Sequence, residues 1–221
     1  MKEQARRVIV VAGGPTDLWP KNALELIKSS ETVTIGVDRG ALHLIEQGIV
    51  PAIAIGDFDS LSETELKRVE SCVENIHYSI PEKDDTDMQL GVLAAMEFYP
   101  QAEMILLGAT GGRMDHFLSN LWLALEPRFQ KVLAQISLLD CQNTIRYFSP
   151  GTYTIKKEGD KKYLAFVCFA PVNGLTLYDA KYTLKQTDVT RPISYSSNEF
   201  VGDSTTFSFS SGCVAVIQSK D

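Results

Sequence analysis

The sequence predicts an α/β domain with a Rossmann-like parallel sheet, followed by a smaller all-β sandwich domain. In the first part of the 221-residue chain, short apolar runs alternate with segments of helical periodicity. From about residue 135 onward, short apolar runs are separated by turn residues, which is typical of antiparallel sheets. These two patterns predict one domain over residues 1–135 and a second over residues 136–221.

Five short apolar runs predict the strands of the first domain. The runs are nearly continuous rather than alternating, as expected for strands buried on both faces of a parallel sheet. Most of them end at glycine or acidic residues. The runs cover residues 7–12, 32–37, 52–55, 75–80 and 103–107.

Five helical segments are predicted between and after these runs. The third begins at Ser62 and has Glu65 three residues later, which predicts a capping box at its N-terminus. Alternation of strands and helices indicates a doubly wound sheet. The segments cover residues 23–29, 40–47, 62–72, 87–99 and 115–125.

Short strands dominate the prediction for the second domain. Turn signals at 149–151, 158–160 and 171–174 divide this region, and Ser211-Gly212 joins a hairpin-like pair. Such spacing is typical of a β-sandwich. The predicted strands cover residues 144–148, 152–156, 163–169, 175–178, 205–210 and 213–218.

Composition and charge narrow the classes of partner. The net charge is −7 and no basic run is present, so nucleic acid is not an expected partner. No apolar run is long enough for a membrane span and no secretory signal is evident, so we expect no membrane association. Four well-separated cysteines without a CxxC pair favour free thiols in the cytoplasm.

Two acids follow the third predicted strand. Asp57 and Asp59 are two residues apart, so in an extended segment their carboxylates point the same way and can converge on one cation. Mg²⁺ takes carboxylate oxygens together with phosphate oxygens of a substrate. The alternative is that one of the two caps the following helix.

A second acidic cluster, Asp84-Asp85-Thr86-Asp87, precedes a predicted helix. Acids in a first helical turn complement the helix dipole, which is a purely structural interpretation. Mutual repulsion among three acids favours a cation beside one or two of them. Both interpretations stay open for this cluster.

The segment after the fifth predicted strand, GATGGRMDH at 108–116, is rich in glycine. Its backbone N–H groups can bind a phosphate, and Arg113 adds a charged fork for phosphate oxygens, although such a segment is also a common tight turn. Neither a Walker A nor a GxGxxG sequence is present, which excludes an ordinary P-loop kinase and a dinucleotide dehydrogenase. Acidic and glycine-rich strand ends at one sheet edge predict a metal–nucleotide site without specifying the substrate.

The ordered motifs resemble thiamine pyrophosphokinases. They are GDFDS at 56–60, DDTDMQ at 84–89, GATGGRMDH at 108–116 with Asn120 after it, and SSNEF at 196–200. The resemblance implies ATP and thiamine as substrates, AMP and thiamine diphosphate as products, and Mg²⁺ as the metal. It also implies a homodimer whose active sites are each shared between subunits.

The resemblance also implies roles for individual residues. Asp57, Asp59 and Asp87 match the metal-binding acids, and Arg113 matches a catalytic phosphate contact. The segment Asp179-Ala180-Lys181-Tyr182 matches the one that supplies an aromatic ring to stack on thiamine, here Tyr182, with Ser197 and Asn198 as polar contacts. The residues expected around the nucleotide are Asp38, Gly40, Ser60, Asp84, Thr86, Gln89, Thr110, Gly111, Gly112, Asp115 and His116.

Two positions depart from the family pattern. Asp38-Arg39-Gly40 stands where the family usually has Asp-Gly-Gly, and Tyr195-Ser196 precedes the SNE sequence, where small residues are common. The first departure affects local backbone or phosphate contacts, and the second affects the shape of the thiamine site.

The expected reaction is attack by the thiamine hydroxyl on the β-phosphorus of ATP, with AMP as the leaving group. Asp59 or Asp87 is a candidate general base, and the sequence does not decide between them. The alternatives are a pyrophosphokinase acting on a hydroxymethyl pterin and a non-enzymatic nucleotide or thiamine sensor.

Overall fold

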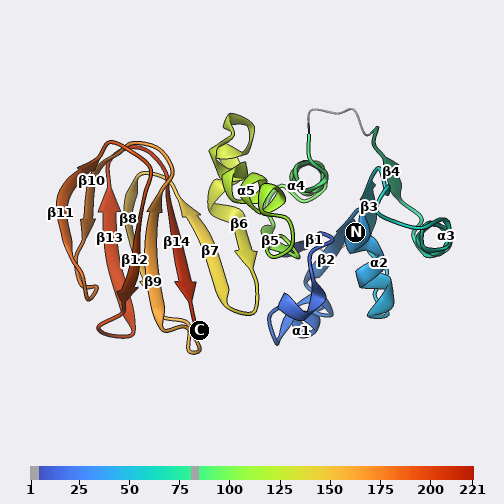
Figure 1. Cartoon of the computed structure of the whole chain (residues 1–221), viewed down its shortest axis with the longest axis horizontal. Coiled ribbons are helices and arrows are strands. Elements are labelled where there is room, and N and C mark those ends of the chain that lie inside the picture. The colour runs from blue at the N-terminus through green and yellow to red at the C-terminus, as the bar shows by residue number, and fades with distance from the viewer. Residues whose placement is uncertain (1–4, 81–84) are drawn as a thin grey trace. The chain divides into compact units, whose positions relative to one another are not determined.

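The computed structural model of the chain describes residues 5–80 and 85–221, which divide into two compact units (Figure 1). Unit 1 contains the described residues up to Leu123 together with Leu138–Cys141, and unit 2 contains Ala124–Ser137 and Gln142–Asp221. The predicted boundary between residues 135 and 136 falls where the two units interleave along the chain. Asp84, a predicted nucleotide-binding residue, lies outside the described residues.

Unit 1 is built on a parallel sheet, as predicted. Its five strands pair in the order β5-β1-β2-β3-β4, and β6 (Ile136–Leu139) follows β5 at the other side. The order places β1 in the interior of the sheet, between β5 and β2, where Val8–Val11 are buried completely. The strands are β1 (Arg7–Val11), β2 (Thr32–Val37), β3 (Ile53–Gly56), β4 (Ile76–Tyr78) and β5 (Glu103–Leu107).

Within residues 5–80 and 85–221, five α-helices connect or follow these strands. The predicted capping box is present at α3, where the Ser62 backbone N–H donates to Glu65 Oε2 over 2.8 Å and Glu65 N–H donates to Ser62 Oγ over 3.4 Å. The α-helices are α1 (Ala23–Ile27), α2 (Arg39–Glu46), α3 (Glu63–Cys72), α4 (Asp87–Phe98) and α5 (Met114–Trp122). Three 3₁₀ segments are η1 (Thr16–Leu18), η2 (Leu123–Leu125) and η3 (Pro127–Gln135).

Apolar side chains of the sheet hold the helices of unit 1 in place, and on the opposite face from the two clusters below, Gly91 of α4 packs against Val10 and Val37. One cluster joins β1 and β5 to α1 and α2, and includes Ile9, Ile27 and Leu107. A second joins β3 to α2 and α3, and includes Phe58 and Val69. Burial on both faces explains why the strands read as continuous apolar runs rather than alternating ones.

Gly40 lets α2 approach the central strand closely. A Cβ atom built on Gly40 would lie 1.9 Å from the carbonyl oxygen of Val11, so no side chain fits there. The end of β1 and the start of α2 are therefore packed backbone against backbone. Because β1 ends and α2 begins at the same edge of the sheet, this contact also sets the position of the residues that precede α2.

Unit 2 is a sandwich of two antiparallel sheets, as predicted. Its core is shared by both, with Phe166 of β9 packed edge-on to Phe207 of β13 at a centroid distance of 5.2 Å. One layer has the strand order β12-β9-β14-β7, which is a section of the ten-stranded sheet, and the other layer is the four-stranded sheet β11-β10-β13-β8. The strands are β7 (Asn143–Phe148), β8 (Gly151–Lys156), β9 (Tyr163–Cys168), β10 (Val172–Leu177), β11 (Leu184–Val189), β12 (Ile193–Glu199), β13 (Ser204–Phe209) and β14 (Val214–Ser219).

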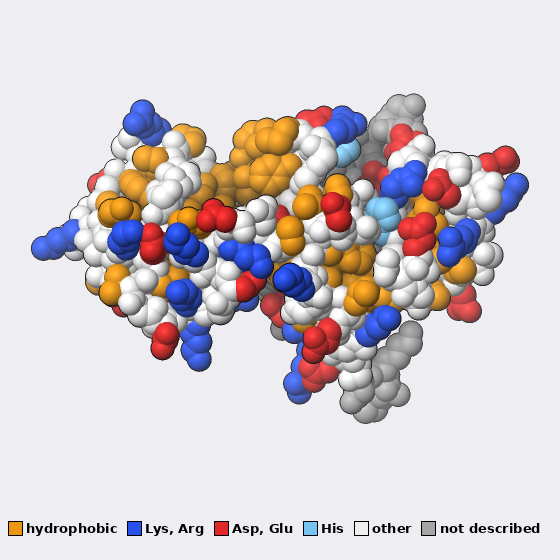
Figure 2. Space-filling view, turned by 60° about the horizontal axis from the view of Figure 1, so that its bottom comes forward, with side chains coloured by type: hydrophobic (Ala, Val, Ile, Leu, Met, Phe, Trp, Pro, Cys, Tyr) orange, Lys and Arg blue, Asp and Glu red, His pale blue; other side chains and the backbone are white. Residues whose placement is uncertain are grey.

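The surface of the protein carries mixed charge. On the face drawn in Figure 2, lysine and arginine side chains are interspersed with aspartate and glutamate rather than gathered in one area. Within the described part of the chain, no helix has the length and apolar character needed to cross a membrane.

Substituting Gly40 with alanine is expected to destabilise unit 1. The added methyl group must displace α2 from β1, at a cost of about 1–3 kcal/mol for overpacking, although alanine is the better helix former. Both tryptophans of the chain, Trp19 and Trp122, lie in unit 1, so their fluorescence during denaturant unfolding reports on this unit. The control is Gly159→Ala, because an added Cβ at Gly159 meets nothing within 4 Å. Equal unfolding midpoints for the two variants would contradict the packing role.

Candidate active site

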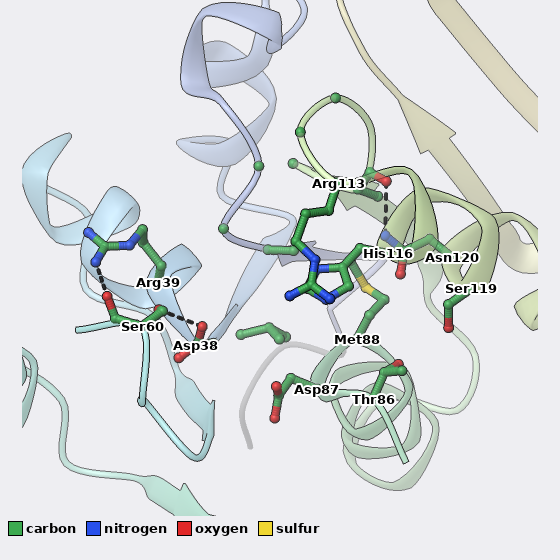
Figure 3. A pocket seen from close by; sticks show the side chains of 18 of the residues that line it. Asp38, Arg39, Ser60, Thr86, Asp87, Met88, Arg113, His116, Ser119 and Asn120 are labelled. Carbon is green, nitrogen blue, oxygen red and sulfur yellow. Dashed lines mark hydrogen bonds between the residues drawn. The ribbon is translucent and has the colours of Figure 1, made fainter. Parts of the chain in front are cut away.

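A cavity of about 600 Å³ opens at the carboxyl ends of the parallel strands of unit 1 (Figure 3). This is the edge at which ligands bind in open α/β sheets. Segments after β1, β2, β3 and β5 contribute to its wall, together with the first turns of α4 and α5. The lining residues are Ala12–Pro15, Val37–Arg39, Asp57, Ser60, Asp85–Met88, Gly108, Ala109, Gly111–Arg113, His116, Ser119 and Asn120.

Three carboxylates converge at one side of this cavity. One oxygen each of Asp38, Asp57 and Asp59 lies within 4.8 Å of the other two. Asp38 Oδ2 accepts a hydrogen bond from Ser60 Oγ over 2.6 Å. Asp38 Oδ1 is buried and has no hydrogen-bond partner among the residues that the structure describes.

This arrangement fits a hard divalent cation. A buried carboxylate oxygen without a partner is costly, and a metal ion would satisfy it. Oxygen ligands from several carboxylates are what Mg²⁺ takes in proteins. Asp38, which the sequence suggested for the nucleotide end, therefore belongs with Asp57 and Asp59 by geometry.

The segment Asp57-Phe58-Asp59 reaches this geometry through a turn, so the expectation of an extended segment is wrong. Phe58 has φ of 56°, and its side chain is buried in the cluster between β3 and α3. The Asp59 N–H donates to Asp57 Oδ1 over 3.1 Å, which closes the turn. The buried ring of Phe58 thus anchors the segment from below, while Asp57 lines the cavity and Asp59 stays exposed beside it.

Asp38 has an unusual backbone conformation, with φ of 49° and ψ of −126°. Non-glycine residues avoid this region, and such outliers concentrate at functional sites. Burial raises the pKa of Asp38, hydrogen bonds from the Ser60 side chain and the Arg39 backbone oppose the rise, and the nearby charges of Asp87 and Asp57 add to it. A cation beside these groups would offset the same repulsion.

Asp87, the third predicted metal ligand, lies at the first position of α4 and points into the cavity (Figure 3). It is not part of the group of three carboxylates that lie within 4.8 Å of one another. Asp87 lines the same cavity as Asp38, and its charge contributes to the raised pKa of Asp38. Asp87 is therefore placed to contact a cation or the phosphates from a different element.

Two glycine turns hold each other at the opposite side of the cavity. The Gly14 N–H after β1 donates to the Gly108 carbonyl after β5 over 3.1 Å, and a Cβ on Gly14 would lie 2.3 Å from that oxygen. Asn120 of α5 is buried and donates from Nδ2 to the Ala109 carbonyl over 2.9 Å. These contacts fix the backbone of the predicted phosphate-binding loop.

Arg113 reaches into the cavity from the start of α5 (Figure 3). Its Nε and Nη2 donate to Asp115 over 3.1 and 2.6 Å. The hydrogen bond from Arg113 lowers the pKa of Asp115 to about 2. Both side chains are well exposed, so a phosphate can compete with Asp115 for the guanidinium.

Most of the predicted nucleotide-binding residues line the cavity, but some have structural contacts instead. Gln89 and Thr86 form a capping box for α4, with Thr86 N–H donating to Gln89 Oε1 over 2.6 Å. The predicted residues that line the cavity are Asp38, Asp57, Ser60, Thr86, Asp87, Gly111, Gly112, Arg113 and His116. Those that do not are Gly40, Asp59, Gln89, Thr110 and Asp115.

Sequence reasoning missed several lining residues, among them Gly13, Gly14, Met88 and Ser119. The glycine pair could have been found, because it follows β1 and ends at the same edge of the sheet as the other motifs. Ser119 lies three residues after His116 on α5, a spacing that places both on one helix face.

The predicted thiamine-binding residues belong to unit 2. The Tyr182 side chain is 58% exposed, whereas Asn198 is buried. Asn198 Oδ1 accepts from the Tyr182 N–H over 2.9 Å, and Asn198 Nδ2 donates to the Tyr182 carbonyl over 2.8 Å. Ser197 is exposed, has φ of 59°, and lies at a register shift between β12 and β9. Asn198 thus holds the backbone that presents the Tyr182 ring.

Comparison with known proteins identifies the family. The family model described as thiamin pyrophosphokinase, catalytic domain, matches residues 24–136, and the one described as its vitamin B1 binding domain matches residues 152–214. The chain belongs to the thiamine pyrophosphokinase family. The predicted resemblance and the predicted activity, thiamine pyrophosphokinase, are thereby confirmed.

Curated and solved relatives agree with this assignment. Thiamine pyrophosphokinase from Bacillus subtilis (strain 168) is 39% identical over 98% of this chain and all of its own length. A solved family protein from Enterococcus faecalis is 50% identical with a TM-score of 0.91, covering 97% of this chain and 99% of its own. The yeast enzyme, at 15% identity and a TM-score of 0.77 over 98% of this chain and 87% of its own, supports the fold alone.

We expect Asp38→Asn to weaken cation binding at least about tenfold, because even residues that only orient metal ligands affect affinity by that factor. Isothermal titration of Mn²⁺, which shares the preference of Mg²⁺ for oxygen ligands, into protein without nucleotide measures this affinity. Asp17→Asn is the control, since Asp17 is exposed in η1 and does not line the cavity. Unchanged Mn²⁺ affinity in Asp38→Asn would remove Asp38 from the site.

Proposed function

We propose that this chain transfers a pyrophosphoryl group from ATP to the hydroxyl of thiamine in an Mg²⁺-dependent reaction. The observation that carries the proposal is the group of three carboxylates with a buried, unpartnered Asp38 oxygen, in a cavity that also contains the glycine-rich loop. Family membership supplies the substrate class. The products would be AMP and thiamine diphosphate.

The residues of unit 1 divide the handling of the phosphates between them. Asp38, Asp57 and Asp59, with Asp87 from α4, would hold Mg²⁺, which when bound neutralises phosphate oxygens. The backbone N–H groups of the glycine-rich loop and the Arg113 guanidinium would bind oxygens on the other side of the chain of phosphates.

In the proposed step the thiamine hydroxyl oxygen forms a bond to the β-phosphorus, and the bond from that phosphorus to the α,β-bridging oxygen breaks. AMP leaves with the electron pair of that bond, and the hydroxyl proton passes to a carboxylate, Asp59 or Asp87. The contribution of the protein is mainly positioning and charge stabilisation, as in other phosphoryl transfers.

Unit 2 would bind thiamine through Tyr182. The face of an exposed aromatic ring attracts a cation such as the thiazolium, and Lys181 Nζ already lies 5.6 Å from the Tyr182 ring centroid. Ser197, exposed beside it, would supply a polar contact. Asn198 would act by holding Tyr182, because its amide contacts the Tyr182 backbone.

We also propose a cytoplasmic homodimer with shared active sites. Tyr182, Ser197 and Asn198 belong to unit 2, whereas the residues that line the cavity belong to unit 1. Met114 and Trp122 of α5 are 67% and 50% exposed, and Figure 2 shows a gathered hydrophobic area of the kind that a second copy would cover. Four free cysteines, two of them buried, support a reducing compartment.

Product analysis tests the reaction. With Mg²⁺, ATP and thiamine, the purified protein should form AMP and thiamine diphosphate in equal amounts, because the hydroxyl attacks the β-phosphorus. Chromatography of the nucleotides and of thiamine esters gives both products in one sample. ADP with thiamine monophosphate would mean a simple kinase instead. AMP formed only with a hydroxymethyl pterin would identify a different acceptor, and binding without turnover would indicate a sensor.

Mixing of defective chains tests the shared site. An Asp57→Asn chain and a Tyr182→Ala chain should regain activity when combined, because one of the two sites in each mixed dimer then has both intact units. The control combines Asp57→Asn with Asp59→Asn, where every site keeps one defective unit 1 and no activity should return. Absence of rescue in confirmed mixed dimers would show that each site is formed by a single chain.

A further inference from the structure

Arg39 bridges two segments that carry the carboxylate cluster. It is the first residue of α2 and directly follows Asp38. Its Nη2 donates to the Ser60 carbonyl (Figure 3). Its Nη1 donates to Glu65 Oε1 over 3.2 Å. One guanidinium therefore ties the start of α2 to both the loop after β3 and the first turn of α3.

Further hydrogen bonds of Ser60 and Glu65 extend this bridge into a network around the loop after β3. The Ser60 hydroxyl donates to Asp38, and the Ser60 carbonyl accepts from Arg39. The consecutive residues Asp38 and Arg39 therefore both bind Ser60 of the loop after β3. Glu65 uses its second oxygen, Oε2, to accept from the Ser62 N–H. Residues 60–62 directly follow Asp59. Arg39 binds the first of them, Ser60, and Glu65 binds the last, Ser62.

We propose that Arg39 is a positioning residue for the cation site: with Glu65 it fixes the loop after β3 so that Asp57 and Asp59 stay beside Asp38. The inference rests on the proposed function only in taking the carboxylate cluster as a cation site. Asp59 is exposed and Asp57 is half-buried, so packing alone restrains their carboxylates weakly. Their mutual repulsion favours separation, and the Arg39 bridge opposes it.

A direct phosphate contact is the competing role for Arg39, since the residue lines the cavity. Its guanidinium contacts Ser60 and Glu65, so the geometry supports the positioning role. Exposed ion pairs contribute little to global stability, so the effect should appear in cation affinity rather than in the unfolding midpoint.

The sign of the change in affinity distinguishes positioning from simple electrostatics. Arg39→Gln removes a positive charge near the carboxylates, which by charge alone would strengthen cation binding. Loss of positioning predicts the opposite, a weakening of about tenfold, the lower end of what residues that orient metal ligands contribute. Mn²⁺ titration without nucleotide or thiamine measures it, and hydrogen exchange of residues 57–62 should become faster in the same variant.

Glu65→Gln provides a second variant away from the cavity. A glutamine keeps an oxygen for the Ser62 N–H and therefore the capping box, but it removes the charge that faces Arg39. Glu63→Gln is the matched control, because Glu63 lies in the same helical turn, contacts Lys67 over 3.7 Å, and carries the same charge. We expect weaker Mn²⁺ binding and faster loop exchange in Glu65→Gln and neither change in Glu63→Gln.

Three results would overturn the proposal. Unchanged or stronger Mn²⁺ binding in Arg39→Gln would do so, as would equal losses in Glu65→Gln and Glu63→Gln. Normal Mn²⁺ binding together with weaker binding of metal-free ATP in Arg39→Gln would make Arg39 a phosphate contact. Failure of the proposed function is separate, because it would appear as absent thiamine diphosphate formation by the unsubstituted protein, whatever the Mn²⁺ titrations show.

Discussion

The site depends on holding three carboxylates within 4.8 Å of one another against their repulsion. The fold achieves this by bringing the ends of β2 and β3 together in parallel, so that Asp38 and the Asp57-Phe58-Asp59 turn emerge at one edge. Burial of Phe58 and the close packing of Gly40 on Val11 fix these segments from below. The excess of negative charge is what a divalent cation would neutralise, and the packing beneath the site holds in place the groups that such a cation would contact.

Strands β1, β2, β3 and β5 of unit 1 could be predicted because burial on both faces leaves apolar runs in the sequence. The same logic fails for β11 and β12, which were not predicted. Their sequences, LKQTDV and ISYSSNE, are mostly polar because each strand lies at the end of its sheet and is largely exposed. β6 was missed for a different reason, since its four residues directly follow a helical pattern and are too short to stand out.

The location of the candidate site was predictable from the sequence, whereas its internal geometry was not. Motifs at strand ends indicate one edge of a parallel sheet, whatever their exact conformation. The grouping of Asp38 with Asp57 and Asp59 depends on positive φ values at Asp38 and Phe58. Non-glycine residues usually avoid positive φ, so the sequence does not predict these two conformations. Gly40 and Gln89, both expected around the nucleotide, have structural contacts in packing and helix capping, and their roles at the nucleotide stay predictions.

The two units present their functional groups by a common principle, in which a rigid backbone carries an exposed side chain. In unit 2 the Asn198 side-chain amide forms hydrogen bonds with the backbone N–H and the carbonyl of Tyr182. Asp179, three residues before Tyr182, accepts a hydrogen bond at Oδ1 from Thr205 Oγ1. The Tyr182 ring is thereby exposed, while its backbone is restrained by hydrogen bonds. This restraint would lower the entropic cost of stacking the ring on a ligand. Since the buried Asn198 amide is engaged in this way, discrimination among flat cationic ligands would depend on the Tyr182 ring and the exposed Ser197.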